Sequence, residues 1–97
     1  MPHYVTLVRY THQGIAHIKE SPARLDAAKK AAEKAGGKLH GWYLTMGQYD
    51  AVLISEFPND DATAKFCLSV AALGNVSTET LRAFTEGEYR NIVDGLS

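Results

Sequence analysis

The feature that most constrains the fold is a hairpin signal near the middle of the chain. Residues 38–45 and 49–57 have the composition of strands, and only Met46-Gly47-Gln48 separates them. So short a connection, with a glycine in it, joins neighbouring strands that run antiparallel. Any fold of this chain must therefore accommodate an adjacent pair of strands at this point.

The segments on either side of the hairpin complete a simple order of elements. A strand at 3–10 and a two-piece helical pattern at 11–35 precede it, and a helical pattern at 60–73 and a strand at 76–84 follow it. The order is β-α-β-β-α-β, with a short final helix that opens at a Thr85 capping box. This order predicts an α+β ferredoxin-like sandwich, in which both helices cover one face of a four-stranded sheet.

Capping residues predict where the helices begin and end. Thr11 caps a first short piece, and Ser21 caps the next helix with Pro22 in its first turn. Gly36-Gly37 ends that helix, and Asn59 caps the helix after the hairpin. The spacing of apolar residues predicts two buried helical stripes: Leu25, Ala28, Ala32 and Ala35, then Ala62, Phe66, Val70 and Leu73.

The sheet face opposite the helices has no cover from within the chain. We expect apolar side chains there, namely Tyr4, Val8, Tyr10, Val52, Ile54 and Phe84. Such a patch is at the upper end of what monomers expose, roughly 300–600 Å². A second copy burying ~800 Å² per partner would gain about 10 kcal/mol before association costs. The predicted assembly is a homodimer, with a higher oligomer as an alternative.

Composition excludes several classes of partner and site. The 97 residues form a single domain, and 10 Lys+Arg against 11 Asp+Glu give no electrostatic signal for nucleic acid or an anionic membrane. The lone Cys67 excludes an internal disulfide and a cysteine-rich zinc site. No run of ~18 apolar residues and no leader pattern are present, so we expect a cytoplasmic protein.

Several stretches in a fixed order resemble the GYD-domain proteins, which are small bacterial proteins. They are Thr11-His12-Gln13-Gly14-Ile15, Ile18-Lys19-Glu20-Ser21-Pro22, Gly47-Gln48-Tyr49-Asp50, Glu56-Phe57-Pro58-Asn59-Asp60 and the run from Gly74 to Thr85. The resemblance spans nearly the whole chain, which we expect to form one GYD-type domain over residues 1–97. It implies a dimeric α+β barrel and leaves the reaction open. Barrels of related fold include cofactor-free monooxygenases, isomerases, haem enzymes and stress-response proteins, which is an analogy of fold alone.

Four residues are candidates for catalysis: Asp50, Glu56, Arg82 and His17. Asp50 and Glu56 lie six positions apart along one strand, about 20 Å, so they cannot act as a close carboxylate pair. Arg82 could anchor an anion while one acid, or His17, accepts a proton. The structural alternative is an Arg82–carboxylate bridge that fixes the register of a dimer interface.

Aromatic and polar strand residues are candidates for binding a ligand between the two sheets of a dimer. They are Tyr4, Thr6, His40, Trp42, Tyr43, Tyr49 and Thr80. In a regular strand Trp42 and His40 share one face and Tyr43 lies on the other. An aromatic-lined pocket suits a flat ligand, whereas ordinary core packing is the structural alternative.

Metal and cofactor sites are not expected. His12 and His17 are five residues apart, about 140° around a helix, which is not the four-residue spacing of helical zinc sites. A haem ligand at His17 is the alternative to a cofactor-free site. We therefore predict a protein that binds a small apolar or aromatic molecule. The alternatives are a cofactor-independent monooxygenase or isomerase, and a structural or stress-response assembly module.

Overall fold

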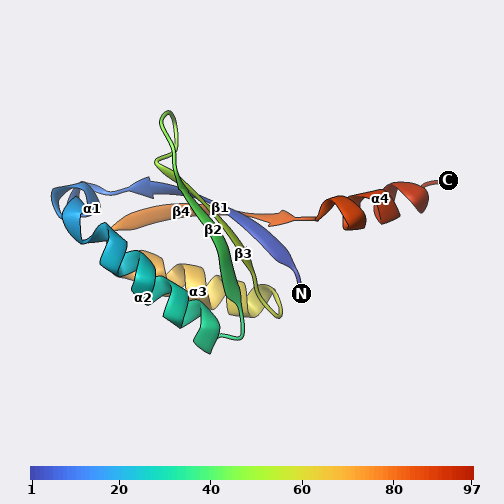
Figure 1. Cartoon of the computed structure of the whole chain (residues 1–97), viewed down its shortest axis with the longest axis horizontal. Coiled ribbons are helices and arrows are strands. Elements are labelled where there is room, and N and C mark those ends of the chain that lie inside the picture. The colour runs from blue at the N-terminus through green and yellow to red at the C-terminus, as the bar shows by residue number, and fades with distance from the viewer.

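The computed structural model describes all residues 1–97, and its element order follows the prediction (Figure 1). The elements are β1 (His3–Tyr10), α1 (His12–Ala16), a 3₁₀ turn η1 (Ile18–Glu20), α2 (Ser21–Lys34), β2 (Lys38–Leu44), β3 (Ala51–Glu56), α3 (Asp60–Ala72), β4 (Val76–Ala83) and α4 (Glu86–Asp94).

The four strands form one antiparallel sheet in the order β2-β3-β1-β4. The β2–β3 hairpin is the one that the sequence predicted. The two long helices, α2 and α3, lie together on one side of the sheet, and the opposite side has no helix over it (Figure 1). The α+β ferredoxin-like prediction is therefore confirmed.

The register of β1 decides which side chains face the helices. Tyr4 lies opposite Ser55 and Val8 opposite Ala51, and all four are buried beneath the helix layer. The expectation that Tyr4, Val8 and Tyr10 lie on the uncovered side is wrong, because the alternation of a strand turns them toward the helices together. The uncovered side carries a set of apolar side chains that we call the open face: Val5, Leu7, Tyr43, Val52, Ile54 and Leu81.

Most of the predicted helix boundaries are confirmed. The Thr11 side chain accepts a hydrogen bond from the Gly14 amide, and the Asn59 side chain accepts one from Ala62. The prediction that Ser21 caps α2 is wrong: η1 runs directly into the helix, so Glu20 occupies the cap position without a side-chain bond. Leu73, which was expected to be buried, is 66% exposed at the end of α3.

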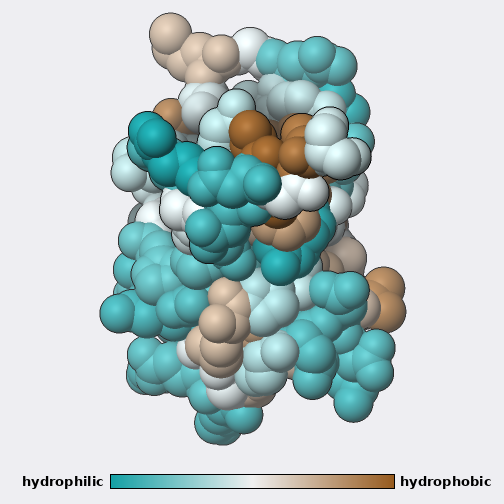
Figure 2. All heavy atoms as spheres, turned by 90° about the vertical axis from the view of Figure 1, so that its right-hand side faces the viewer, coloured by the Kyte–Doolittle hydropathy of each residue, from teal (hydrophilic) through white to brown (hydrophobic).

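The final helix, α4, projects from the end of the sheet and makes the molecule elongated, 52 × 31 × 17 Å (Figure 1). It opens with the predicted capping box, in which the Thr85 backbone amide donates to Glu88 and lowers the pKa of that carboxyl. Its apolar side chains Tyr89, Ile92 and Val93 are all exposed. Figure 2 views the molecule from this side and shows hydrophobic residues grouped among hydrophilic ones. No helix combines the length and apolar character needed to cross a bilayer.

Candidate functional site

A cavity of about 310 Å³ lies between the sheet and the two long helices. Thr6 and Trp42 form part of its wall on the sheet, Leu25 and Ala28 on α2, and Cys67 on α3. Most of the lining side chains are apolar. The cavity thus lies within a single chain, on the opposite side of the sheet from the open face.

Side-chain size explains why space is left in this layer. At one end the interior is filled by the aromatic residues Tyr4, Phe57 and Phe66, with 5.1 Å between the ring centroids of the last two. Further along α2, after Arg24 and Leu25, the helix lines the cavity with three small side chains, Ala27, Ala28 and Ala31. Protein interiors are normally close-packed, so a row of alanines that face a sheet without bulky partners leaves a void.

A few polar groups interrupt the apolar wall. Thr6 Oγ1 lies 3.1 Å from Thr80 Oγ1, which in turn lies 3.3 Å from Cys67 Sγ. The two threonine hydroxyl groups therefore have hydrogen-bond partners within the protein. They give the sheet side of the cavity a small polar spot, and no Asp or Glu side chain lies in the wall.

Arg24 is the charged residue in the cavity wall. Its Nη1 donates to the His17 carbonyl oxygen at 3.0 Å and lies 3.9 Å from a Glu20 carboxylate oxygen. Its Nη2 is buried and has no hydrogen-bond partner. A buried donor without a partner costs about 1–3 kcal/mol, so this nitrogen is suited to an acceptor atom supplied by a bound molecule.

Sequence reasoning did not identify Arg24, although a signal was present. Residues 24, 28, 31 and 35 follow the three- and four-residue spacing of one helix face, on which the last three are alanines. A single arginine on an otherwise apolar face is unusual, because charged residues are rarely buried without a role.

The candidate ligand-binding residues are divided between the two sides of the sheet. Thr6 and Trp42 line the cavity, and Tyr4 and Thr80 lie on the same side. Tyr43 lies on the open face, and His40 also contacts residues there. The expectation that Trp42 and His40 share a face is wrong, because a register shift between Leu39 and Gly41 interrupts the alternation of β2. No single pocket gathers all seven candidates.

Tyr4 acts as a link between the sheet and α3. Its ring is 4% exposed, and its hydroxyl donates to the Asp60 carboxylate at the start of α3. Burial, and then the bond to Asp60, raises the pKa of the Tyr4 phenol. These contacts favour a packing role over a ligand-binding one.

The Gly47–Asp50 turn is held by hydrogen bonds to neighbouring strands. Asp50 Oδ2 accepts from the Tyr10 amide at 2.9 Å, and the Asp50 amide donates to the Val8 carbonyl at 2.8 Å. Tyr49 donates its hydroxyl to Glu79 at 2.8 Å, which raises the pKa of the Tyr49 phenol. Asp50 therefore closes the end of the β1–β3 ladder and is already engaged with backbone.

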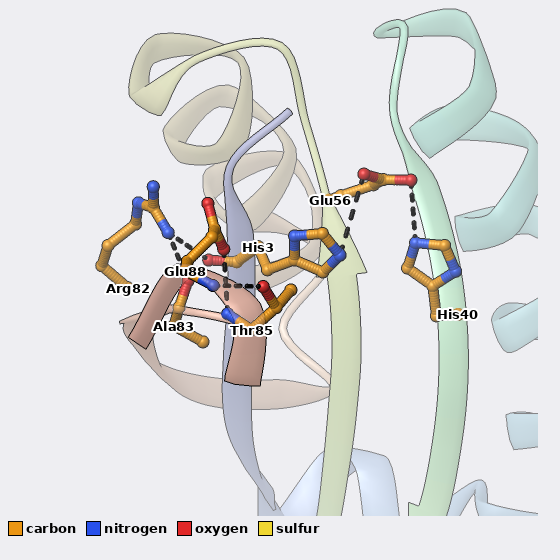
Figure 3. A network of polar contacts seen from close by, with 7 residues as sticks. All are labelled: His3, His40, Glu56, Arg82, Ala83, Thr85 and Glu88. Atoms are coloured by element: carbon orange, nitrogen blue, oxygen red, sulfur yellow. Dashed lines mark hydrogen bonds and ion pairs between the residues drawn. The ribbon is translucent and has the colours of Figure 1, made fainter. Parts of the chain in front are cut away.

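Arg82 does not meet either candidate acid. Its Nη1 donates to the backbone carbonyls of His3 and Ala83 (Figure 3). Its guanidinium carbon lies 4.4 Å from the Phe84 ring centroid. It pairs with Tyr4 near the start of β1, whereas Asp50 bonds to the end of that strand. His17 is exposed, with Nδ1 3.1 Å from the Gln13 carbonyl oxygen. The four candidate catalytic residues do not converge on one site.

Glu56 is the one candidate catalytic residue with other titratable side chains close to its carboxylate, because two imidazoles lie beside it. His40 Nε2 is 2.9 Å from one of its carboxylate oxygens and His3 Nε2 is 3.8 Å from the other (Figure 3). Sequence reasoning did not select His3. Its position directly opposite Glu56 on the neighbouring strand depends on a strand register that the sequence alone does not provide.

Comparisons with known proteins give a family and a fold. A sequence model described as the GYD domain matches residues 4–93. TTHA0845 from Thermus thermophilus is similar in structure, with a TM-score of 0.56 and 22% identity over 88% of this chain and 95% of that one. At3g17210 from Arabidopsis thaliana has a TM-score of 0.53 and 15% identity over the same shares. No curated protein matches the chain.

Proposed function

The chain belongs to the GYD domain family, and we propose that it binds a small, mainly apolar molecule in the cavity between its sheet and the helices α2 and α3. The observation that carries this proposal is the cavity itself. Its volume of about 310 Å³ falls at the lower end of known ligand pockets, roughly 300–1,000 Å³, and its wall is apolar with a few polar groups. The site lies beneath the helices of one protomer, not between two sheets as the sequence had suggested.

Binding without turnover is the better of the functional alternatives. The cavity wall contains no Asp, Glu or His side chain. A cofactor-independent monooxygenase or isomerase needs a group that accepts a proton within hydrogen-bond reach of its substrate. The purely structural alternative is less favoured because a protein that needs only a packed core gains nothing from an unfilled cavity.

Arg24 defines the chemical class of the ligand. An apolar body would occupy the space beside Ala28 and Trp42, and one acidic or carbonyl group would accept a hydrogen bond from Arg24 Nη2. Arginine is suited to this role because its guanidinium stays charged and donates to carboxylates in a fixed geometry. We therefore propose a compact aromatic or aliphatic acid as the ligand.

Filling the cavity is expected to abolish binding. Trp42 is the single tryptophan of the chain and lies in the wall, so its fluorescence reports directly on occupancy. Titration with the naphthalene probe 1-anilinonaphthalene-8-sulfonate should quench Trp42 in the wild type. Ala28→Phe should weaken probe binding by at least about tenfold, or about 1.4 kcal/mol, because the new ring occupies the space that the probe needs.

Ala23→Phe is the matched control, since Ala23 is exposed on the same helix and lies outside the cavity wall. This variant should bind the probe as the wild type does. Equal affinity in Ala28→Phe and the wild type, with both folded by circular dichroism, would place the bound probe elsewhere.

The Arg24 assignment makes a separate prediction about charge. Arg24→Gln should weaken binding of the anionic probe by at least about 10-fold, because a hydrogen bond to a charged group is worth about 1.5–3 kcal/mol. It should leave binding of the uncharged analogue N-phenyl-1-naphthylamine within about twofold. A parallel loss for both probes would show that Arg24 only supports the wall.

We also propose that the protein acts as a homodimer. The open face presents Val5, Leu7, Val52 and Ile54 without any cover, with Leu81 47% and Tyr43 63% exposed. The apolar side of α4 is likewise unpartnered and projects from the body (Figure 1). A second copy that packs sheet to sheet and also lies against α4 would bury both the open face and the apolar side of α4.

A further inference from the structure

We propose that His3, His40 and Glu56 bind a divalent transition-metal ion, with Zn²⁺ as the preferred species. The three residues come from three neighbouring strands, β1, β2 and β3, and their side chains meet at one end of the sheet (Figure 3). Glu56 lies between the two imidazoles. No metal site was predicted from the sequence, because the lone Cys67 and the spacing of His12 and His17 gave no sign of one and the pairing of the three strands was not known.

The geometry is close to that of a metal centre. One ligand atom from each of the three residues lies within 4.8 Å of the other two. Zinc binds imidazole nitrogen and carboxylate oxygen at about 2.0–2.2 Å, which separates ligand atoms by a little over 3 Å. The distances from His40 Nε2 and His3 Nε2 to the two Glu56 oxygens, 2.9 Å and 3.8 Å, lie on either side of this separation, so small side-chain rotations would bring the ligand atoms to it.

The chemistry of the set favours a borderline metal over calcium or magnesium. Two imidazoles and one carboxylate form a known zinc ligand set, whereas calcium and magnesium prefer oxygen ligands. Three protein ligands leave at least one coordination position open to water or to a bound molecule.

The arrangement of the two imidazole rings also points to a shared ligand. The rings lie stacked, with 5.7 Å between centroids and 10° between planes, so both present their edges to Glu56. A hydrogen bond between His40 and Glu56 alone would explain the position of one ring but not the convergence of both.

The site is separate from the ligand cavity, whose wall includes none of the three residues. It also lies at the end of the open face, beyond Val5 and Ile54 along their strands. Loss of the metal should therefore leave binding of the naphthalene probe unchanged, and the two proposals can fail independently.

The test is a titration of the tag-free, chelator-treated full chain with Zn²⁺ by isothermal calorimetry. Co²⁺ serves as a spectroscopic probe, since its visible absorption reports the coordination geometry. We expect one ion per chain. His3→Gln, His40→Gln and Glu56→Gln should each lower affinity by at least about 100-fold, which exceeds the 10–100-fold cost of losing an outer-shell partner.

The other two histidines provide matched controls. His12 and His17 are exposed and lie outside the cluster, so His12→Gln and His17→Gln should bind Zn²⁺ within about twofold of the wild type. His40 is at the exposed edge of the sheet, so His40→Gln should fold even if a variant at His3 does not. Absence of Zn²⁺ binding, unchanged affinity in His40→Gln and Glu56→Gln, or equal loss in the control variants would overturn the proposal.

Discussion

Replacing Ile54 with aspartate is expected to convert the proposed dimer into a folded monomer. Ile54 lies on a central strand of the open face, opposite Val5 on β1 and Gly41 on β2. In the monomer the new carboxylate meets water, so the fold should persist. In a face-to-face dimer two unpaired carboxylates would be buried near each other, which costs several kcal/mol and should weaken association by at least about 1,000-fold.

Sedimentation velocity at micromolar concentration measures this effect. Leu68→Asp is the matched control, because Leu68 is 71% exposed on α3, away from the sheet. It should sediment as the wild type does. A wild type that sediments as a stable monomer, or a dimer that survives Ile54→Asp, would contradict the proposed assembly.

Replacing Gly14 with alanine should have the largest effect on folding. A Cβ atom at Gly14 would lie 2.0 Å from the carbonyl oxygen of Asn75, far inside van der Waals contact. The backbone cannot easily move away: the Thr11 amide donates to the same Asn75 oxygen at 3.1 Å, and Thr11 Oγ1 donates to the Gly74 carbonyl at 2.6 Å. These bonds fasten the start of α1 to the start of β4.

The expected loss is about 3 kcal/mol or more, because overpacking against rigid backbone lies at the upper end of steric effects. That is a large part of the total stability of about 5–15 kcal/mol for a domain. Urea unfolding followed by circular dichroism measures the difference.

Gly87 provides the control for this experiment. A Cβ at Gly87 would have its nearest neighbour at 4.0 Å, and the residue lies in α4 with no constraint on its backbone. Gly87→Ala should be neutral or stabilise by up to about 1 kcal/mol through helix propensity. If Gly14→Ala and Gly87→Ala unfold at the same urea concentration, the close approach of α1 to β4 is not what the structure describes.

The sequence was sufficient for the architecture because each element carries its own local signal. The alternation of β1, the helical spacing in α2 and α3, and the caps at Thr11, Asn59 and Thr85 all act within a few residues. Local signals of this kind can be read without knowing which strands pair. The family resemblance is confirmed by the match over residues 4–93.

The sites were harder to predict, because the metal site depends on the register of paired strands and the cavity depends on the combined volume of side chains from several elements. One irregularity in β2 between Leu39 and Gly41 moved His40 away from the face of Trp42 and toward Glu56. A shift of one residue reverses every side chain beyond it, so no reasoning from regular alternation could place His40 correctly. The cavity likewise depends on side chains from both helices and several strands, whose volumes do not follow from any single segment.

Residue-resolved NMR of the wild type during titration with 1-anilinonaphthalene-8-sulfonate tests the central claim most directly. We predict that the largest shifts in backbone amide signals, and in the Trp42 indole signal, will occur at the cavity wall, namely Thr6, Arg24, Trp42, Cys67 and Thr78. Shifts confined to the open face around Leu7 and Ile54, or to Ile92 and Val93 on α4, would contradict a binding site beneath the helices.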